Sequence, residues 1–190
     1  MNEDLDITLA DLTITKNAEN CILRVYPDPA SPLAVALQAR NLWSTVLAGG
    51  AIPPELTDRS GAPWTGGWGH TGPDVIQGMI VTQEIADAWL LSDAHRSAAN
   101  VKRVVTVPLT KEEFIALVDL DFNIGNHNFD TSTLLRKLNA GDIDGAVAEF
   151  ARWNQAGGRV LAGLVKRRDG EKVLFLVGAS HAKTQTSGDL

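Results

Sequence analysis

Hydrophobic and polar positions change their spacing along the first half of the chain. The segment that ends at Ala18 has a loose apolar stripe at helical spacing, and residues 22–26 form a short apolar run that favours a strand. Residues 31–50 predict a further helix, which begins with a serine and a proline and ends at two glycines. Residues 52–72 are rich in proline and glycine and predict loops and a hairpin. This half therefore predicts a small lobe of mixed helix and strand.

The second half keeps a helical period. Thr110 and Glu113 form a capping box in front of an apolar face, and Gly125 marks the end of that helix. The last helix is richly basic. The predicted helices span residues 82–103, 110–124, 132–140, 142–152 and 160–176. The first of them is long enough to connect the small lobe to a helical lobe, and the predicted fold class is α+β, mainly α.

Composition narrows the class of protein. The chain has 190 residues, of which 44% are hydrophobic and 21% charged, so it is too apolar for intrinsic disorder. Its formal net charge of −6 argues against nucleic acid or an anionic membrane as the main partner, because both attract a basic surface. Cys21 is the single cysteine and cannot form an internal disulfide.

The N-terminus does not resemble a targeting signal. The first fifteen residues carry four acids and no base, which is the reverse of the basic start of a signal peptide. No uncharged run reaches the roughly 18 apolar residues of a membrane helix. We therefore expect a cytoplasmic protein without a signal peptide or transmembrane segment.

Two carboxylates are the first candidates for chemistry. On one continuous helix, Glu19 and Asp28 would lie on opposite faces, but the prolines on both sides of Asp28 favour extended structure and a turn between the two. Two carboxylates that face one cleft can cleave a glycosidic bond, one as the acid and one as the anion. The spacing alone equally fits an exposed helix-end glutamate and a turn aspartate.

A second candidate is the segment from Trp64 to His70, which reads Trp-Thr-Gly-Gly-Trp-Gly-His. Its glycines permit close backbone approach, and its two tryptophans offer flat faces on which sugars can stack. A structural hairpin with its aromatic side chains in the core fits the same residues.

Together these segments resemble the signature of phage T4-type lysozymes (endolysins, glycoside hydrolase family 24). The resemblance starts with Glu19 to Asp28 and continues with Thr65 to Gly72. Shorter matching pieces follow in the same order: Val107-Pro-Leu-Thr110, Phe122-Asn-Ile-Gly125, Ser132-Thr-Leu-Leu135, Leu138-Asn-Ala-Gly141, Arg152-Trp-Asn154, Gly163-Leu164, and Arg167-Arg168 with Glu171. It covers roughly residues 16 to 176 with one interruption. Each piece is weak alone, but their shared order is specific.

The resemblance implies a muramidase, which hydrolyses the β-1,4 bond between N-acetylmuramic acid and N-acetylglucosamine in peptidoglycan and causes host cell lysis. By position, Glu19 would be the general acid that protonates the leaving oxygen. Asp28 would stabilise the developing positive charge and, with Thr65, position the attacking water. No cofactor is implied.

The resemblance also places residues around these three. His70 would have a structural role and pair with Asp93 on the long helix. The four histidines and Cys21 lack the spacing of metal ligands, so no metal site is expected. Three residues lie in stretches that line the substrate cleft in relatives: Asn123, Trp153 and Gln155. Burial in the core is an equal alternative for Trp153.

The implied organisation is a single lysozyme-like catalytic domain over residues 1–190. It consists of a small lobe at about 16–81, a connecting helix at about 82–103, a helical lobe at about 104–178 and a tail at 179–190. An insertion at 29–64 departs from the short-form relatives, in which the threonine follows the aspartate by six residues rather than by thirty-seven.

Two single positions also depart from expectation. Asp121 lies on an apolar stripe, where an unpaired buried carboxylate is costly; it would either line the cleft or reach water at an edge. Gly66 stands where relatives usually have an aliphatic residue.

Other functions fit the same residues. A lytic transglycosylase would cleave the same bond without water, and a non-catalytic peptidoglycan-binding module could keep the fold. The same chemistry could also serve an injected toxin or bacteriocin. For an endolysin we expect a monomer that binds peptidoglycan glycan strands and accumulates in the host cytoplasm. A separate holin-type membrane protein would release it to the cell wall and periplasm. Because residues 152–171 contain five bases and two acids, we expect the anionic wall beside this part of the chain.

Overall fold

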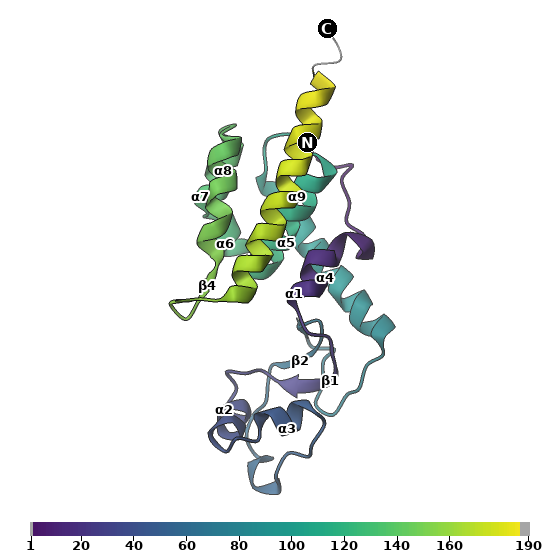
Figure 1. Cartoon of the computed structure of the whole chain (residues 1–190). Coiled ribbons are helices and arrows are strands. Elements are labelled where there is room, and N and C mark those ends of the chain that lie inside the picture. Colours follow the sequence, from purple (N-terminus) through teal and green to yellow (C-terminus); the bar gives the residue numbers. More distant parts are fainter. Residues whose placement is uncertain (1, 187–190) are drawn as a thin grey trace. The chain divides into compact units, whose positions relative to one another are not determined.

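The computed structural model describes residues 2–186 and the side chains of residues 2–180. The chain folds into two compact units. Residues 19–90 form one of them, which we call the mixed unit, and residues 1–18 together with 91–190 form the other, the helical unit. Most of the described residues are helical, and the strands are short, which confirms the predicted α+β, mainly α class (Figure 1).

The mixed unit is built on a small antiparallel sheet. β1 (Ile22–Pro27) pairs with β2 (Trp64–Gly67), which pairs with β3 (His70–Thr71). The other edge of β1 is covered by residues 79–81, because Val25 N–H donates to Met79 O at 3.0 Å and Val81 N–H donates to Leu23 O at 2.9 Å. β1 therefore has hydrogen-bonded neighbours on both sides.

The segment between β1 and β2 forms two helices rather than the single predicted one. They are α2 (Pro32–Ala39) and α3 (Trp43–Leu47), and the 3₁₀ turn η2 (Pro54–Leu56) follows them. The break occurs at Asn41, whose φ of 58° is left-handed and incompatible with a continuing helix. The predicted N-terminal cap is present, since Ser31 Oγ accepts from Ala34 N.

α4 (Gln83–Val104) belongs to both units along its length, and the prediction of a long helix at 82–103 is confirmed within one residue. None of the described helices combines the length and the apolar composition needed to cross a membrane.

The helical unit is organised around two long helices, α5 (Lys111–Ile124) and α9 (Ala162–Thr186), which pack side by side (Figure 1). The capping box of Thr110 and Glu113 starts α5 as predicted. Buried phenylalanines fill the interior, and the rings of Phe150 and Phe175 lie 5.8 Å apart. The remaining elements are η1 (Leu9–Leu12), α1 (Thr13–Ala18), α6 (Asn126–Asp130), α7 (Thr133–Asn139), α8 (Ile143–Glu149), η3 (Phe150–Trp153), β4 (Gln155–Ala156) and β5 (Arg159–Val160).

The last helix is longer than predicted, because it continues through Thr186 instead of ending at Leu176, so that the predicted tail at 179–190 begins inside a helix. Gly178 lies in this extension and is buried against Thr110 and Glu113, where an added Cβ would overlap both side chains. The glycine thus lets α9 approach the start of α5 closely instead of ending the helix.

Candidate functional site

Glu19 and Asp28 stand just before and just after β1. The strand predicted at residues 22–26 is confirmed as β1. The turn that the sequence placed between the two carboxylates instead follows Asp28, where Ser31 N–H donates to Asp28 O at 2.9 Å. The pairing of β1 with β2 is irregular between Ile22 and Tyr26. Such a bulge bends a strand, so the two carboxylates are not at the ends of a straight segment.

The negative charges of Glu19 and Asp28 both influence the ionisation of Tyr26. Burial is the largest cause of the raised pKa of its phenol, and the two negative charges raise this pKa further. The ring is half-buried and meets the ring of Trp43 edge-on, with centroids 6.3 Å apart. One hydroxyl group therefore experiences the charge of both carboxylates. Sequence reasoning did not select Tyr26, although it lies inside the motif that contains them.

Thr65 lies directly opposite Tyr26 in the antiparallel pair of β1 and β2. Directly opposite residues point to the same face, and so do residues two apart on a strand. Tyr26 and Thr65 consequently share one face of this pairing, and Asp28 follows β1 directly. The Thr65 side chain is buried.

Asp28 is held by its backbone and by one carboxylate oxygen. Its N–H donates to Gly61 O at 3.1 Å and to Pro63 O at 2.9 Å, and its Oδ1 accepts from Ala30 N at 2.8 Å. Its Oδ2 makes no hydrogen bond with any group among the described residues, and the residue is half-buried. This oxygen is available to a water or a substrate group.

The hairpin of β2 and β3 presents its aromatic residues in different ways. The half-buried Trp68 donates from Nε1 to Asp87 Oδ1 at 2.7 Å, and the half-buried Trp64 packs against the segment between β1 and β2. The His70 ring is buried and stacks on Trp89 with centroids 4.7 Å apart, and its Nε2 lies 3.3 Å from Asp74 Oδ1. These contacts favour the structural reading of the hairpin.

Asp93 forms an ion pair with Arg96 one turn later on α4. His70 belongs to the mixed unit and Asp93 to the helical unit. Their predicted pairing stays a prediction.

The three residues predicted to bind substrate all lie in the helical unit. Asn123 Oδ1 accepts from Arg168 Nη2 at 3.0 Å, so its amide is oriented by a buried cation. Trp153 is half-buried and lines a cavity of about 220 Å³ together with Thr133, Glu149 and Arg152. Gln155 is exposed at the start of β4. Their role in binding a glycan stays a prediction.

Buried charges surround the two arginines of the basic helix. Arg167 binds Asp119 with two hydrogen bonds of 2.9 and 3.0 Å, and Thr15 donates to the same carboxylate. Arg168 donates to Glu171 at 2.6 Å. Burial and the neighbouring Asp119 raise the pKa of Glu171 to about 10, against the lowering influence of both arginines. These residues of the sequence signature thus build the interior of the helical unit.

Asp121 is fully buried, which excludes the edge position in water that the sequence offered as one alternative. Its Oδ1 accepts from Asn100 Nδ2 at 2.7 Å, and burial raises the pKa of its carboxyl above the usual range. Asn100 also donates to Asp130 at 2.9 Å. The carboxyl is therefore stabilised inside a polar network on the apolar stripe of α5.

β4 and β5 form a short hairpin that the sequence did not predict. Its two turn residues, Gly157 and Gly158, have φ values of 56° and 73°. Two adjacent glycines between short strands are the signal of such a turn and could have revealed it. Among the residues whose side chains are described, no cluster of three histidine, cysteine, aspartate or glutamate residues is arranged to hold a metal ion.

Comparison with known proteins places these features in context. Residues 49–171 match the sequence model of the family described as phage lysozyme. An endolysin of Acyrthosiphon pisum secondary endosymbiont phage 1 is 47% identical over 116 residues, which cover 59% of this chain and 79% of that protein. An endolysin of Bacillus phage B103 is 41% identical over 117 residues, which cover 62% of this chain but only 44% of the relative.

Solved structures show the same fold. The muramidase domain of SpmX from Asticaccaulis excentricus superposes with a TM-score of 0.68 at 30% identity, covering 90% of this chain and 98% of that domain. A mutant of P22 lysozyme superposes with a TM-score of 0.66 at 28% identity, covering 90% of this chain and 99% of the other.

Proposed function

Because the chain belongs to the phage lysozyme family, we propose that it is an endolysin that hydrolyses the β-1,4 bond between N-acetylmuramic acid and N-acetylglucosamine in peptidoglycan. The observation that carries this proposal is the arrangement around Tyr26. Thr65 lies opposite this tyrosine on the neighbouring strand, Asp28 follows β1 directly, and the phenol experiences the charge of both Glu19 and Asp28.

In the proposed reaction, Glu19 donates a proton to the glycosidic oxygen as the bond breaks, which makes the sugar a better leaving group. The carboxylate of Asp28 stabilises the positive charge that develops at the anomeric carbon. Asp28 Oδ2 and the Thr65 hydroxyl hold the attacking water, which reaches the carbon from the other side and inverts its configuration. The proton that the water loses passes to the Asp28 carboxylate, and exchange with solvent then returns a proton to Glu19 and removes the one on Asp28. This inverting outcome follows the resemblance and needs a gap between the carboxylates that admits one water.

The alternative of a lytic transglycosylase differs in the fate of that water. A transglycosylase closes an anhydro ring on the muramic acid and takes up no water, so its products are lighter by one water. Asp28, whose Oδ2 makes no hydrogen bond with the described residues, and the Thr65 hydroxyl are suited to orienting a water, and this favours hydrolysis. Mass analysis of the released muropeptides separates the two reactions.

The central experiment replaces the proposed acid. Glu19→Gln keeps the size and the hydrogen-bonding capacity of the side chain but cannot donate a proton, so we expect the release of reducing ends from purified peptidoglycan to fall by about 10²-fold or more. Glu55→Gln, at an exposed glutamate of the mixed unit that pairs with Arg40, is the matched control. Circular dichroism monitors the folding of both variants.

Three results would decide between the readings. Unchanged release by Glu19→Gln removes Glu19 from the mechanism. Binding of the wild-type protein to peptidoglycan without any release identifies a non-catalytic binding module. Loss of release in the Glu19→Gln variant alone supports the muramidase.

The proposal also concerns the oligomeric state of the protein and its route to the cell wall. We expect the protein to act as a monomer and to reach the wall after a holin-type protein opens the membrane. Co-expression in a bacterial host tests the second point, since lysis should require the membrane lesion, and lysis without it would contradict this route.

A further inference from the structure

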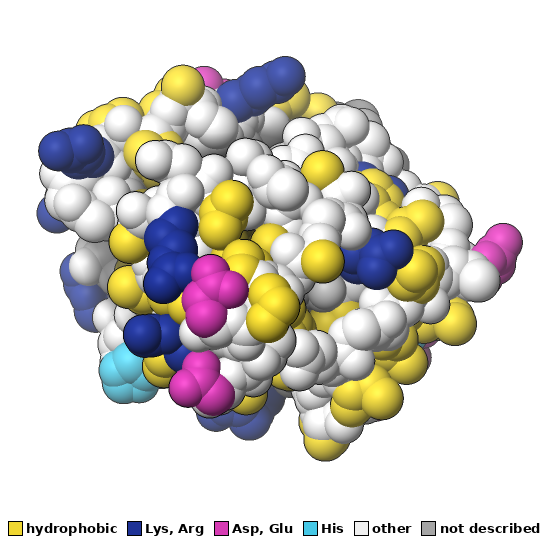
Figure 2. All heavy atoms as spheres, turned by 90° about the horizontal axis from the view of Figure 1, so that it is seen from below, with side chains coloured by type: hydrophobic (Ala, Val, Ile, Leu, Met, Phe, Trp, Pro, Cys, Tyr) yellow, Lys and Arg dark blue, Asp and Glu magenta, His cyan; other side chains and the backbone are white. Residues whose placement is uncertain are grey.

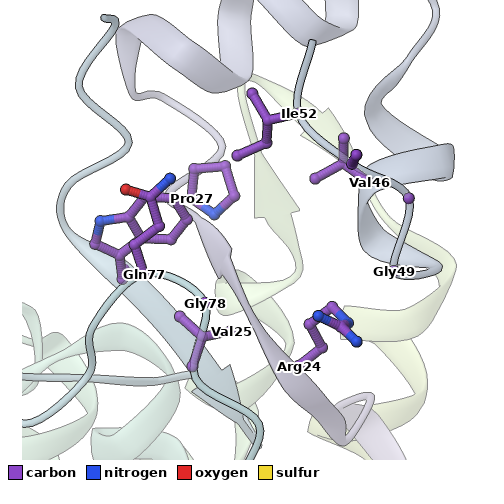
Figure 3. A pocket seen from close by; sticks show the side chains of 11 residues that line it. Arg24, Val25, Pro27, Val46, Gly49, Ile52, Gln77 and Gly78 are labelled. Atoms are coloured by element: carbon purple, nitrogen blue, oxygen red, sulfur yellow. The ribbon is translucent and has the colours of Figure 1, made fainter. Parts of the chain in front are cut away.

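The mixed unit contains a cavity that the proposed mechanism does not use. It has a volume of about 420 Å³, which is within the range of small-molecule sites. It lies where the segment between β1 and β2 meets the loop that precedes residues 79–81 (Figure 3). The lining residues are Arg24, Val25, Pro27, Val46, Gly49, Gly50, Ala51, Ile52, Trp64, Gln77 and Gly78.

The candidate catalytic residues Glu19, Asp28 and Thr65 are not among the residues that line this cavity. Pro27 and Trp64, which do line it, lie opposite each other, one position along from the pair of Tyr26 and Thr65. Because successive side chains on a strand alternate between faces, Pro27 and Trp64 point away from the face that carries Tyr26 and Thr65. The cavity is therefore a site with its own set of side chains.

The apolar wall of the cavity is supported from behind. Val46 is part of a buried cluster with Leu33, Leu37 and Leu56, and Ile52 and Trp64 pack against that cluster. The inserted segment therefore has its own small core, which holds one side of the cavity in place. A wall fixed in this way reduces the ordering cost of binding.

Two hydrophilic side chains, those of Arg24 and Gln77, lie at this cavity beside the aliphatic residues and Trp64. Figure 3 shows Gln77 beside Pro27 on one side, and Ile52, Val46 and Gly49 on the other, with Arg24 below Gly49. Within the described side chains, neither Arg24 nor Gln77 makes a hydrogen bond or an ion pair through its side chain. Arg24 is also the only charged residue among those that line the cavity, so the site is cationic.

We propose that this cavity binds the carboxyl end of a short peptide of small residues, which in peptidoglycan is the end of the stem peptide. The planar guanidinium of Arg24 is suited to a carboxylate, which it can bind with two parallel hydrogen bonds. The apolar walls accommodate methyl groups, and Gln77 is available to one backbone amide. A glycan would need partners for many more hydroxyl groups than two polar side chains supply. The identification of this peptide with the wall rests on the proposed function.

The test uses the intact protein and a defined probe. Diacetyl-L-lysyl-D-alanyl-D-alanine carries one carboxylate and no other charge, and its C-terminal amide carries none. Titration followed by ¹H–¹⁵N spectra monitors the amides of Gly49, Gly50 and Gly78, which line the cavity. We expect saturable shifts at these glycines with the acid, and none with the amide or with a tetramer of N-acetylglucosamine.

Variants connect the binding to Arg24. Arg24→Gln should weaken the binding of the acid at least tenfold, whereas Arg24→Lys, which keeps the charge but not the planar fork, should restore part of it. Arg59→Gln is the matched control, because it removes another arginine of the mixed unit, one that does not line the cavity. Its affinity should equal that of the wild-type protein.

The proposal fails if the peptide acid produces no saturable shift at the three glycines, or if the peptide amide binds with equal affinity. It also fails if the glycan tetramer shifts the glycine signals instead. Equal affinity of Arg24→Gln and Arg59→Gln for the peptide acid would likewise refute it. Its failure is distinct from failure of the proposed function. Glu19→Gln should keep the peptide affinity while losing hydrolysis. If the wild-type protein cleaves peptidoglycan but does not bind the peptide, only the proposed peptide site is refuted. If it binds the peptide but cleaves no peptidoglycan, only the proposed hydrolysis is refuted.

Discussion

Tyr26 and Thr65 are directly opposite each other on neighbouring antiparallel strands, and this pair fixes the geometry of the candidate site. Asp28 directly follows the strand that contains Tyr26, and the charges of Glu19 and Asp28 both reach the Tyr26 phenol. In the proposed reaction, the register of one short strand pair therefore determines which side chains would meet a substrate.

Titration of Tyr26 tests this arrangement directly, because it is the only tyrosine in the chain. Its ionisation can be followed by ultraviolet difference absorbance. Negative charges nearby make it harder to form a phenolate, so Glu19→Gln and Asp28→Asn should each lower the pKa of Tyr26 relative to the wild-type protein. Asp58→Asn, at an exposed position of the inserted segment, should leave it unchanged. A pKa that does not move in Glu19→Gln would show that this carboxylate lies away from the phenol.

Replacing Asp28 by asparagine should separate catalysis from folding. The asparagine oxygen can still accept from Ala30 N, and the two hydrogen bonds from the Asp28 backbone are unaffected, so we expect the free energy of unfolding to change by less than about 0.5 kcal/mol. The loss of negative charge should reduce hydrolysis by roughly 10²-fold or more. Urea denaturation and release of reducing ends measure the two quantities. Equal activity in Asp28→Asn and Asp58→Asn would mean that the carboxylate of Asp28 has no part in the reaction.

The pH dependence of stability should report on Glu171. Its pKa is raised from 4.5 to about 10 in the folded protein. Between these values the folded state holds a proton that the unfolded state has lost, so this group makes the free energy of unfolding fall as the pH rises through that window. Glu171→Gln imitates the neutral carboxyl and should flatten that decline, whereas the exposed Glu3→Gln should not. Urea denaturation across the pH window measures the slope, and parallel curves for Glu171→Gln and the wild-type protein would indicate an ionised Glu171.

The break between α2 and α3 gives a prediction about stability alone. Asn41 has a left-handed backbone, which costs a residue with a Cβ roughly 1–2 kcal/mol and glycine little. Asn41→Ala should therefore lower the free energy of unfolding by about 1 kcal/mol, and Asn41→Gly should leave it nearly unchanged. Thermal and urea denaturation provide the measurement. If alanine were tolerated as well as glycine, the break would have a cause other than the conformation of this residue.

The sequence predicted best those features that are set by neighbouring residues. The predicted caps at Ser31 and Thr110 are both present, because a cap depends on residues three positions apart. The length of α9 was wrong, since Gly178 is accommodated by contact with distant residues on α5. The burial of Asp121 depends in the same way on Asn100 from another helix.

In the candidate site, too, features set by neighbouring residues could be predicted, whereas those set by distant contacts could not. The motif named Glu19, Asp28 and Thr65 as candidates, and their catalytic roles stay predictions. The bulge in β1 and the pairing of Tyr26 with Thr65 follow from strand register, which the local pattern does not specify. The cavity at Arg24 and Gln77 had no sequence signal, because its walls come from four separate stretches of the chain, at residues 24–27, 46–52, 64 and 77–78.

The backbone N–H of Asp28 explains how Asp28 and Thr65 can belong to one site although thirty-six residues separate them in the sequence. By donating to the carbonyl oxygens of Gly61 and Pro63, it closes the inserted segment at its base, so the step from Asp28 to Thr65 in space is independent of the number of residues between them. The entropy of closing a flexible loop grows slowly, by about 0.6 kcal/mol for each doubling of its length. We therefore expect that the length and sequence of the inserted segment can vary, in evolution or by design, while these two hydrogen bonds keep Asp28 and Thr65 at the same separation.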